Sequence, residues 1–352
     1  MLSIEPRPLI LPFAGVSPAF ASPPSTSGAG ASVLGRVTVG ADLVLGPFAV
    51  IRADGETVSI GAGFCLGEGS TVHIAHGLFA TVIGDRVAVG RNAVVHACTV
   101  ADDCAIEDDV VILDASVVGA GVLIEAGSTI YPRSTLEPGG RYAGSPAVRI
   151  GSISLEECRE RVASIRAEAA VAAARQIRTE GRWGDDGRGA HFVADTAVVR
   201  GDLVLAPGAG VFFGCRFDAA AVTVGRNTNI QDNSVVTAPE GVVTIGDDTT
   251  IGHNVRMSAC RVGSRSLVGI GAVLGEGTVV EDDVLVAAGT VTTYGQVLRS
   301  GWLWGSRPAK PLKPLDDARR SMLSETIGHY VAYGHAFRDA QRSLAARREG
   351  AG

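Results

Sequence analysis

The chain has 352 residues, enough for two domains of ordinary size, each with an ample apolar core. Its net charge is −6 and it has no run of Lys and Arg, which argues against nucleic acid as a partner. The sequence contains no run of 18 consecutive apolar residues, so no membrane-spanning helix is predicted. The Pro-rich N-terminus lacks the apolar segment of a secretory signal.

We therefore expect a cytoplasmic protein, with an organellar matrix as the alternative. The six cysteines form no CxxC pair and no dense framework. This pattern predicts reduced, buried thiols rather than disulfides.

The first half of the chain repeats branched apolar residues at intervals of six. The rungs of this ladder are Val100, Ile106, Ile112, Val118, Ile124 and Ile130. A period of six fits neither a helix nor a simple half-buried strand, but it is typical of hexapeptide β-helices, whose apolar residues point inward. We expect a parallel β-helix over residues 1–152 and an α-helix over 153–180, a segment rich in helix formers.

The second half repeats this organisation. A turn-rich segment, GRWGDDGRG, predicts a linker over 181–189. A second ladder follows 162 residues after the first, at Val262, Val268, Leu274, Val280 and Val286. We expect a second β-helix over 190–313 and a C-terminal helix over 314–349. The predicted fold class is mainly β, with two tandem parallel β-helices that are each followed by a helix.

The two halves align closely, but their histidines differ. In the alignment, the segment GRNAVVHAC (90–98) corresponds to GHNVRMSAC (252–260), and TVHIA (71–75) corresponds to VVTAP (235–239). Three histidines stand where the other copy has another residue: His73 against Thr237, His96 against Ser258, and His253 against Arg91. This split of the histidines can be interpreted as two halves of one shared site, or as random loss of histidines in a degenerate copy.

At these positions the sequence resembles the γ-class carbonic anhydrases of the left-handed hexapeptide β-helix superfamily. The shared features are PFAGVSPAF, an early R-x-D, QDNSVV, IGHNV, the GSPA-type exit and the C-terminal helix. The resemblance implies trimers that hold a metal, usually zinc, at each subunit interface. Two histidine ligands come from one subunit, at the positions of His73 and His96, and the third comes from its neighbour, at the position of His253.

A first-copy face against a second-copy face would then complete one three-histidine site. The resemblance also implies that Gln231 lies near the metal-bound water. It further implies interface ion pairs, formed by Arg52 with Asp54 and by Arg216 with Asp218. His76 suits proton transfer because an unperturbed imidazole titrates near pH 6.5; a solvated loop histidine is the alternative.

Three imidazoles around Zn²⁺ leave one coordination position open, and iron or cobalt are alternative metals. The metal would turn water into hydroxide at neutral pH, and the hydroxide would attack CO2 to give bicarbonate. We therefore expect a carbonate dehydratase, a lyase, whose substrates are CO2 and bicarbonate. The alternatives are a metal-poor scaffold module and a hexapeptide acyltransferase. The expected assembly is a homo-oligomer, with three chains supplying six units as a pseudo-hexameric trimer.

Overall fold

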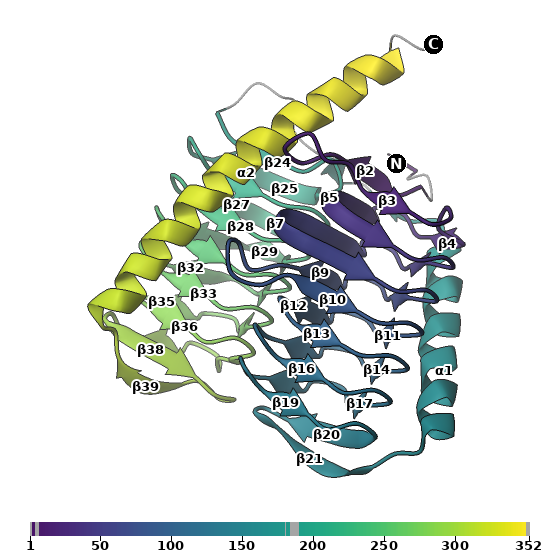
Figure 1. Ribbon diagram of the computed structural model, residues 1–352. Coiled ribbons are helices and arrows are strands. Elements are labelled where there is room, and N and C mark those ends of the chain that lie inside the picture. The colour runs from purple at the N-terminus through teal and green to yellow at the C-terminus, as the bar shows by residue number, and fades with distance from the viewer. Residues whose placement is uncertain (1, 4–6, 180, 184–189, 350–352) are drawn as a thin grey trace. The chain divides into compact units, whose positions relative to one another are not determined.

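The computed structural model describes residues 2–3, 7–179, 181–183 and 190–349 (Figure 1). The chain divides into two compact units: the first is Ser3–Arg178, and the second is Thr179–Gly352 together with Met1–Leu2. Each unit consists mainly of short parallel strands stacked in coils, with one helix alongside. The coils fit the left-handed parallel β-helix, so the predicted fold class is confirmed. That the second unit arose as a copy of the first stays a prediction.

Coils in the first unit have three faces, because its larger sheet bends through the long strands β5 and β7. This sheet contains β2 (Leu9–Leu11), β3 (Ala19–Phe20), β5 (Ser32–Val39), β7 (Val50–Ile60), β9 (Thr71–His73), β10 (Thr81–Ile83), β12 (Val94–His96), β13 (Thr99–Val100), β15 (Val111–Ile112), β16 (Val117–Val118), β18 (Thr129–Ile130) and β19 (Thr135–Leu136). The other sheet contains β4 (Thr26–Ser27), β6 (Val44–Leu45), β8 (Cys65–Leu66), β11 (Ala88–Val89), β14 (Ala105–Ile106), β17 (Leu123–Ile124), β20 (Gly140–Gly144) and β21 (Ala147–Ser152). Two further strands are β1 (Leu2–Ser3) and β22 (Arg178–Thr179).

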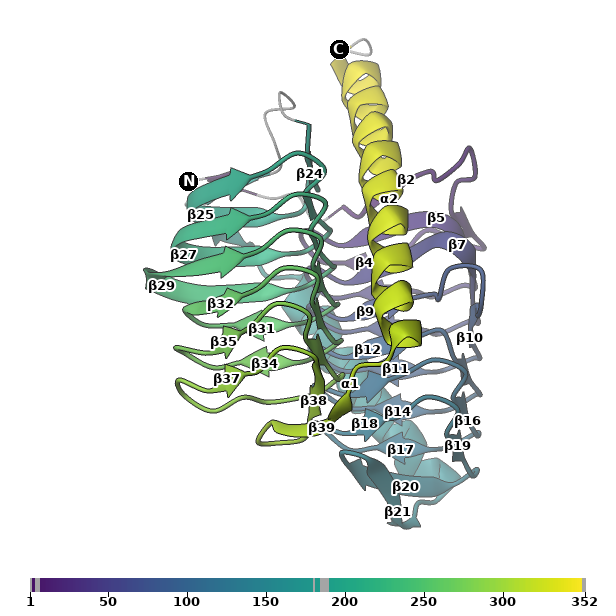
Figure 2. The ribbon, with the colours of Figure 1, turned by 90° about the vertical axis from the view of Figure 1, so that its left-hand side faces the viewer.

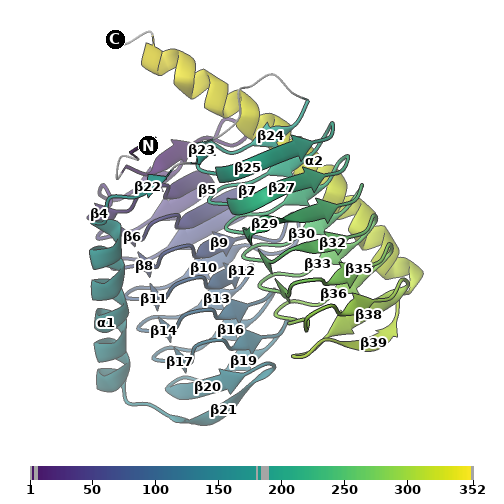
Figure 3. The same ribbon diagram turned by 180° about the vertical axis from the view of Figure 1, so that it is seen from behind.

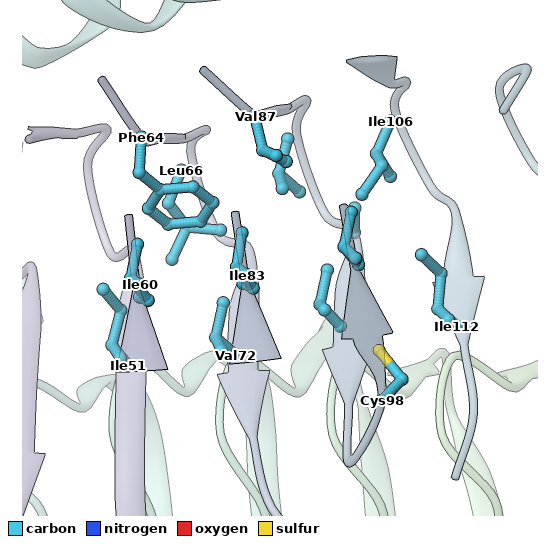
Figure 4. Close-up of a cluster of buried hydrophobic side chains, with 14 of the residues drawn as sticks. Ile51, Ile60, Phe64, Leu66, Val72, Ile83, Val87, Cys98, Ile106 and Ile112 are labelled. Carbon is cyan, nitrogen blue, oxygen red and sulfur yellow. The ribbon is translucent and has the colours of Figure 1, made fainter. Parts of the chain in front are cut away.

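The six-residue ladder visits the three faces in turn. Val100 therefore pairs with Val118 on the next coil, and Ile106 pairs with Ile124. All the ladder residues lie in one buried core, part of which is drawn in Figure 4. Full burial of each such side chain contributes about 1.5–3 kcal/mol, so the stacked rungs hold the coils together.

Polar residues between the rungs form the corners of the coils. Asn92 and Asp103 have φ angles of 52° and 58°, in the left-handed region that Asn and Asp tolerate better than most residues. The corners of the second unit use Asn227 and Asn254 in the same way, with φ of 55° and 54°. This explains why Gly, Asn and Asp separate the apolar positions in the sequence.

Helix α1 (Leu155–Ala173) packs along one face of the first unit, beside β6, β8, β11 and β14 (Figure 3). A capping box begins it: the Ser154 hydroxyl accepts from the Glu157 amide, and the Glu157 carboxylate accepts from the Ser154 amide. Cys158, Val162 and Ile165 are buried against the sheet. The helix is shorter than the predicted 153–180, because the chain returns to a strand at Arg178–Thr179.

Asp103 joins α1 to the coils. Its carboxylate accepts hydrogen bonds from Arg86 of the β-helix, at 2.7 and 3.0 Å, and from Arg159 of α1, at 2.9 and 3.2 Å. The hydrogen bonds from Arg86, which have the larger effect, and from Arg159 hold the pKa of the Asp103 carboxyl well below its usual range. The carboxylate therefore stabilises the folded state as long as it is ionised.

We expect Asp103→Ala to destabilise the protein by about 1 kcal/mol at pH 7, because both arginines are half-exposed and solvent screens them. A carboxyl with a lowered folded-state pKa stabilises above its unfolded pKa, about 3.9, and loses that contribution as the pH falls toward the folded-state pKa. The difference between wild type and variant should therefore shrink below pH ~4. Urea unfolding at pH 7 and pH 3 measures it, and an unchanged difference would contradict the prediction.

The second unit has the same construction, and its stacked coils are seen edge-on in Figure 2. One sheet contains β23 (Arg182–Trp183), β25 (Val198–Leu205), β27 (Arg216–Val224), β29 (Val235–Ile245), β31 (Arg256–Met257), β32 (Cys260–Val262), β34 (Val273–Leu274), β35 (Val279–Val280) and β37 (Val297–Leu298). The other contains β24 (Phe192–Val193), β26 (Gly210–Val211), β28 (Asn229–Ile230), β30 (Thr250–Ile251), β33 (Leu267–Val268), β36 (Leu285–Val286), β38 (Trp302–Gly305) and β39 (Lys310–Pro314).

The predicted linker 181–189 differs from the structure at its start. Arg182–Trp183 is strand β23, which pairs antiparallel with Val198–Val199 of β25. The backbone hydrogen bonds of that pairing outweigh the turn tendency of the neighbouring glycines. Residues 184–189 of the predicted linker lie outside the described residues.

Helix α2 (Asp317–Glu349) packs against β24, β26, β28 and β30 of the second unit. Phe337 is fully buried, with its ring centroid 5.1 Å from that of Phe213. Tyr330 meets Phe212 edge-on at 5.2 Å. These aromatic contacts anchor α2 on the face formed by β24, β26, β28 and β30. His253 lies in the corner that follows β30.

Each stack of coils closes with an antiparallel hairpin, which the sequence did not predict. Strand β20 pairs with β21 in the first unit, and β38 pairs with β39 in the second. The connecting turns contain the GSPA-type motifs, with cis peptide bonds at Ser145–Pro146 and Arg307–Pro308. The motif thus marks a reversal of chain direction before each helix.

The cysteines are buried thiols, all six of them, as predicted. Burial raises the pKa of the Cys65, Cys104 and Cys260 thiols to about 12. Within the described ranges, no helix combines the length and apolar character needed to cross a bilayer.

Candidate metal centre

Two of the three predicted ligands lie together in the first unit. His73 ends β9 and His96 ends β12, and the two residues are direct partners in the parallel register of these strands. His96 follows His73 by 23 positions, which is one coil plus a short loop, so the chain returns to the same face. His73 Nδ1 lies 3.3 Å from His96 Nε2.

A carboxylate contacts the opposite nitrogen of each ring. His73 Nε2 lies 3.0 Å from Asp54 Oδ1, and His96 Nδ1 lies 2.6 Å from Asp114 Oδ1. Asp54 also forms an ion pair with Arg52, and both of these side chains are fully buried. Each imidazole therefore has one nitrogen at a carboxylate and the other facing its neighbour.

This arrangement fits a metal ion. Zinc holds imidazole nitrogens at about 2.0–2.1 Å with tetrahedral angles, which places two ligand nitrogens about 3.3 Å apart. Metal-binding histidines commonly donate their other ring N–H to a carboxylate, as the contacts with Asp54 and Asp114 allow. The donor set and its spacing therefore suit zinc.

His253, the third predicted ligand, lies in a coil corner of the second unit between β30 and β31. Its side chain is fully buried, and Nδ1 lies 3.2 Å from Asp232 Oδ2. Its Nε2 lies 3.5 Å from the hydroxyl of Tyr330, from α2. Asp232 is fixed in turn, because its Oδ1 accepts a hydrogen bond from the Phe213 amide at 3.0 Å.

The counterparts of these histidines are structurally different. Arg91, at the corresponding corner of the first unit, pairs with Asp108 at 2.6 Å and its side chain is mostly exposed. In the second unit, Thr237 and Ser258 follow the paired residues Val236 and Met257 on neighbouring strands. These hydroxyl residues stand where the first unit has its pair of imidazoles.

Of the other predicted site residues, His76 is exposed, in the loop between β9 and β10. Gln231 is buried, and its Nε2 donates to Asn229 Oδ1 at 3.2 Å. In the second unit, Arg216 donates to the Gly214 carbonyl at 3.1 Å, and Asp218 lies 3.6 Å from Arg200. The interface roles of the two Arg and Asp sets, Arg52 with Asp54 and Arg216 with Asp218, stay predictions.

Sequence reasoning missed Asp114 and Tyr330. Asp114 follows His96 by 18 residues, which is one coil of the ladder, so its position beside His96 could have been inferred from the repeat. The contact between Asp54 and His73 was also missed, since Asp54 was assigned to an interface. Tyr330 had no such signal, because the docking of a helix on a β-helix face does not follow from the repeat.

No family model matches the chain. It is 37% identical over 161 residues to Gamma carbonic anhydrase 1, mitochondrial, of Arabidopsis thaliana, a match that covers 43% of this chain and 58% of that protein. The chain therefore spans little more than half the length of this relative. It is also 36% identical over 158 residues to Protein YrdA of Escherichia coli (strain K12), covering 42% of this chain and 86% of that protein.

Among solved structures, a putative acetyltransferase from Desulfovibrio desulfuricans G20 matches with a TM-score of 0.55. The match covers 92% of this chain and 80% of that chain at 13% identity, which shows a likeness of fold alone. The named relatives, the coiled fold and the paired histidines agree with the resemblance found in the sequence. The chain belongs to the γ-class carbonic anhydrase-like family of left-handed hexapeptide β-helix proteins.

Proposed function

We propose that this chain is a carbonic anhydrase-like metalloenzyme that hydrates CO2 reversibly to bicarbonate. One observation carries the proposal: His73 Nδ1 and His96 Nε2 face each other at 3.3 Å, while carboxylates contact the other nitrogen of each ring. Two neutral imidazoles held in this way direct two lone pairs at one point, which a cation would occupy favourably. The relatives named γ carbonic anhydrases support the same chemistry.

The proposed third ligand is His253, so that a first-copy face and a second-copy face build one site between them. The division of residues supports this proposal. The first copy has Arg91 in place of the third histidine, and the second copy has Thr237 and Ser258 in place of the pair. Three chains supply six units, so a pseudo-hexameric trimer satisfies a family interface that closes in threes.

Zinc bound by three imidazoles supplies a Lewis acid that lets water react with CO2 at neutral pH, and iron or cobalt could replace it. His73, His96 and His253 would hold the metal. The buried Gln231 amide would donate a hydrogen bond that orients the reacting oxygen, and the exposed His76 would pass the released proton to solvent. The plant relative's name describes a mitochondrial protein, so an organellar matrix is proposed beside the cytoplasm as the location.

Zinc content and CO2 hydration test the proposal together. We expect the metal-free protein to take up at most one zinc per chain, and CO2 hydration, followed in a stopped-flow pH-indicator assay, to rise in proportion to the zinc bound. His96→Ala should lose both. A folded protein that binds no zinc would contradict the proposal in favour of a non-catalytic scaffold. Zinc binding without CO2 hydration would support the proposed metal site but contradict the proposed catalysis of CO2 hydration.

A further inference from the structure

His73 and His96, the two predicted ligands in the first unit, differ in which ring nitrogen contacts a carboxylate. It is Nε2 in His73, at 3.0 Å from Asp54, and Nδ1 in His96, at 2.6 Å from Asp114. A carboxylate accepts hydrogen bonds and cannot donate one when ionised, so the ring nitrogen facing it must carry the proton. The reverse tautomer would place a nitrogen lone pair against a carboxylate oxygen.

A neutral imidazole has one protonated nitrogen. If His73 is protonated on Nε2 and His96 on Nδ1, their remaining nitrogens both present lone pairs, at a separation of 3.3 Å. No hydrogen bond can form between two lone pairs. The pair is thus arranged to receive a cation, and the two rings offer it different atoms.

We propose that Asp54 and Asp114 are positioning residues that hold His73 and His96 in opposite tautomers, which makes Nδ1 of His73 and Nε2 of His96 the ligand atoms. The ligand role of these two nitrogens rests on the proposed metal site, whereas the two tautomers are expected in the metal-free protein as well. In His96 the carboxylate imposes the Nδ1–H form, which is the minor tautomer of free histidine in water.

The two carboxylates differ in how safely they can be removed. Asp54 is fully buried and paired with Arg52, so its loss threatens folding. The Asp114 side chain is 37% exposed, so its loss should disturb the fold less. The second copy offers a matched control 162 residues further on: Glu276 is exposed and lies one coil after Ser258 rather than after a histidine.

The test is a long-range ¹H–¹⁵N correlation spectrum of metal-free protein labelled with ¹⁵N-histidine, recorded at pH 9. The chain has seven histidines, so substitution of His73 and of His96 assigns their signals. We expect Nε2–H in His73 and Nδ1–H in His96. Asp114→Ala should convert His96 toward Nε2–H and weaken zinc binding about 10–100-fold, whereas Glu276→Ala should change neither.

A His96 that carries its proton on Nε2 in the wild type would overturn the proposal, and so would an unchanged tautomer in Asp114→Ala. Because the tautomers are measured without metal, this result is separate from the proposed function. The expected tautomers in a protein that binds no zinc would uphold the roles of the carboxylates and contradict the metalloenzyme.

Discussion

His253→Ala is expected to abolish zinc binding and CO2 hydration, although His73 and His96 remain in place. Two imidazoles hold zinc far less tightly than three, so zinc content should fall from about one per chain to near zero. The fold should survive, because one buried imidazole is replaced in a corner that β30 and β31 hold by backbone pairing. Metal analysis after gel filtration, together with the CO2 hydration rate, measures the effect.

Arg91→Ala is the matched control for His253→Ala. Arg91 lies at the corresponding corner of the first unit, where it pairs with Asp108 on an exposed surface. Its loss should leave zinc content unchanged and cost stability only slightly. If His253→Ala kept its zinc while His96→Ala lost it, the shared three-histidine site would be refuted.

Mixing two inactive variants tests where the third ligand originates. His96→Ala lacks part of the pair and His253→Ala lacks the third ligand. If sites form between chains, an equal mixture that is dissociated and reassembled should regain about one quarter of the wild-type zinc content and activity. Each site receives its histidine pair and its His253 from independently chosen chains, and each of these is intact in half of the chains. If sites form within a chain, the mixture stays inactive. Either outcome identifies the source of His253.

Asp54→Ala is expected to have the largest effect on stability. Arg52 and Asp54 are fully buried side chains that form an ion pair, and removing the carboxylate leaves the guanidinium's charge buried without that compensation. Breaking a buried pair on one side costs about 3–5 kcal/mol. Urea unfolding of the metal-free protein, followed by circular dichroism, measures this loss.

A double variant separates this stability effect from the effect on the metal site. Arg52→Met combined with Asp54→Leu replaces the pair by apolar side chains of similar volume, which is often close to neutral for stability. We expect it to regain most of the stability lost in Asp54→Ala, but to bind zinc about 10–100-fold more weakly than wild type, because Asp54 also contacts His73 Nε2. Wild-type zinc affinity in the double variant would show that Asp54 serves stability alone.

The repeat made the coils predictable. Spacing by six assigns each apolar rung to a face, and a return every 18 residues gives the register in which Val100 pairs with Val118. The same arithmetic predicts that Asp114 lies beside His96. It gives no help with His73, because the loop between β9 and β10 lengthens that coil, and only the resemblance indicated that His73 joins His96.

Features that depend on contacts between dissimilar elements were not predictable. The closing hairpins interrupt the repeat, so its period carries no information about β21 or β39. The contact of Tyr330 with His253 depends on how α2 docks, and this is determined by the packing of Tyr330 on Phe212 and of Phe337 on Phe213. Propensity predicts that such a helix forms, but not which residue it brings to a given corner.

The hairpin at the end of the second unit has a consequence for solubility. A stack of parallel coils ends in a strand whose free N–H and C=O groups could recruit another chain and grow into a fibril. Strand β39 occupies that edge, and its sequence KPLKP contains both lysines of the chain and two prolines that lack an N–H. Charge repulsion and missing donors make this edge a poor template, so the protein can expose a coil end without polymerising.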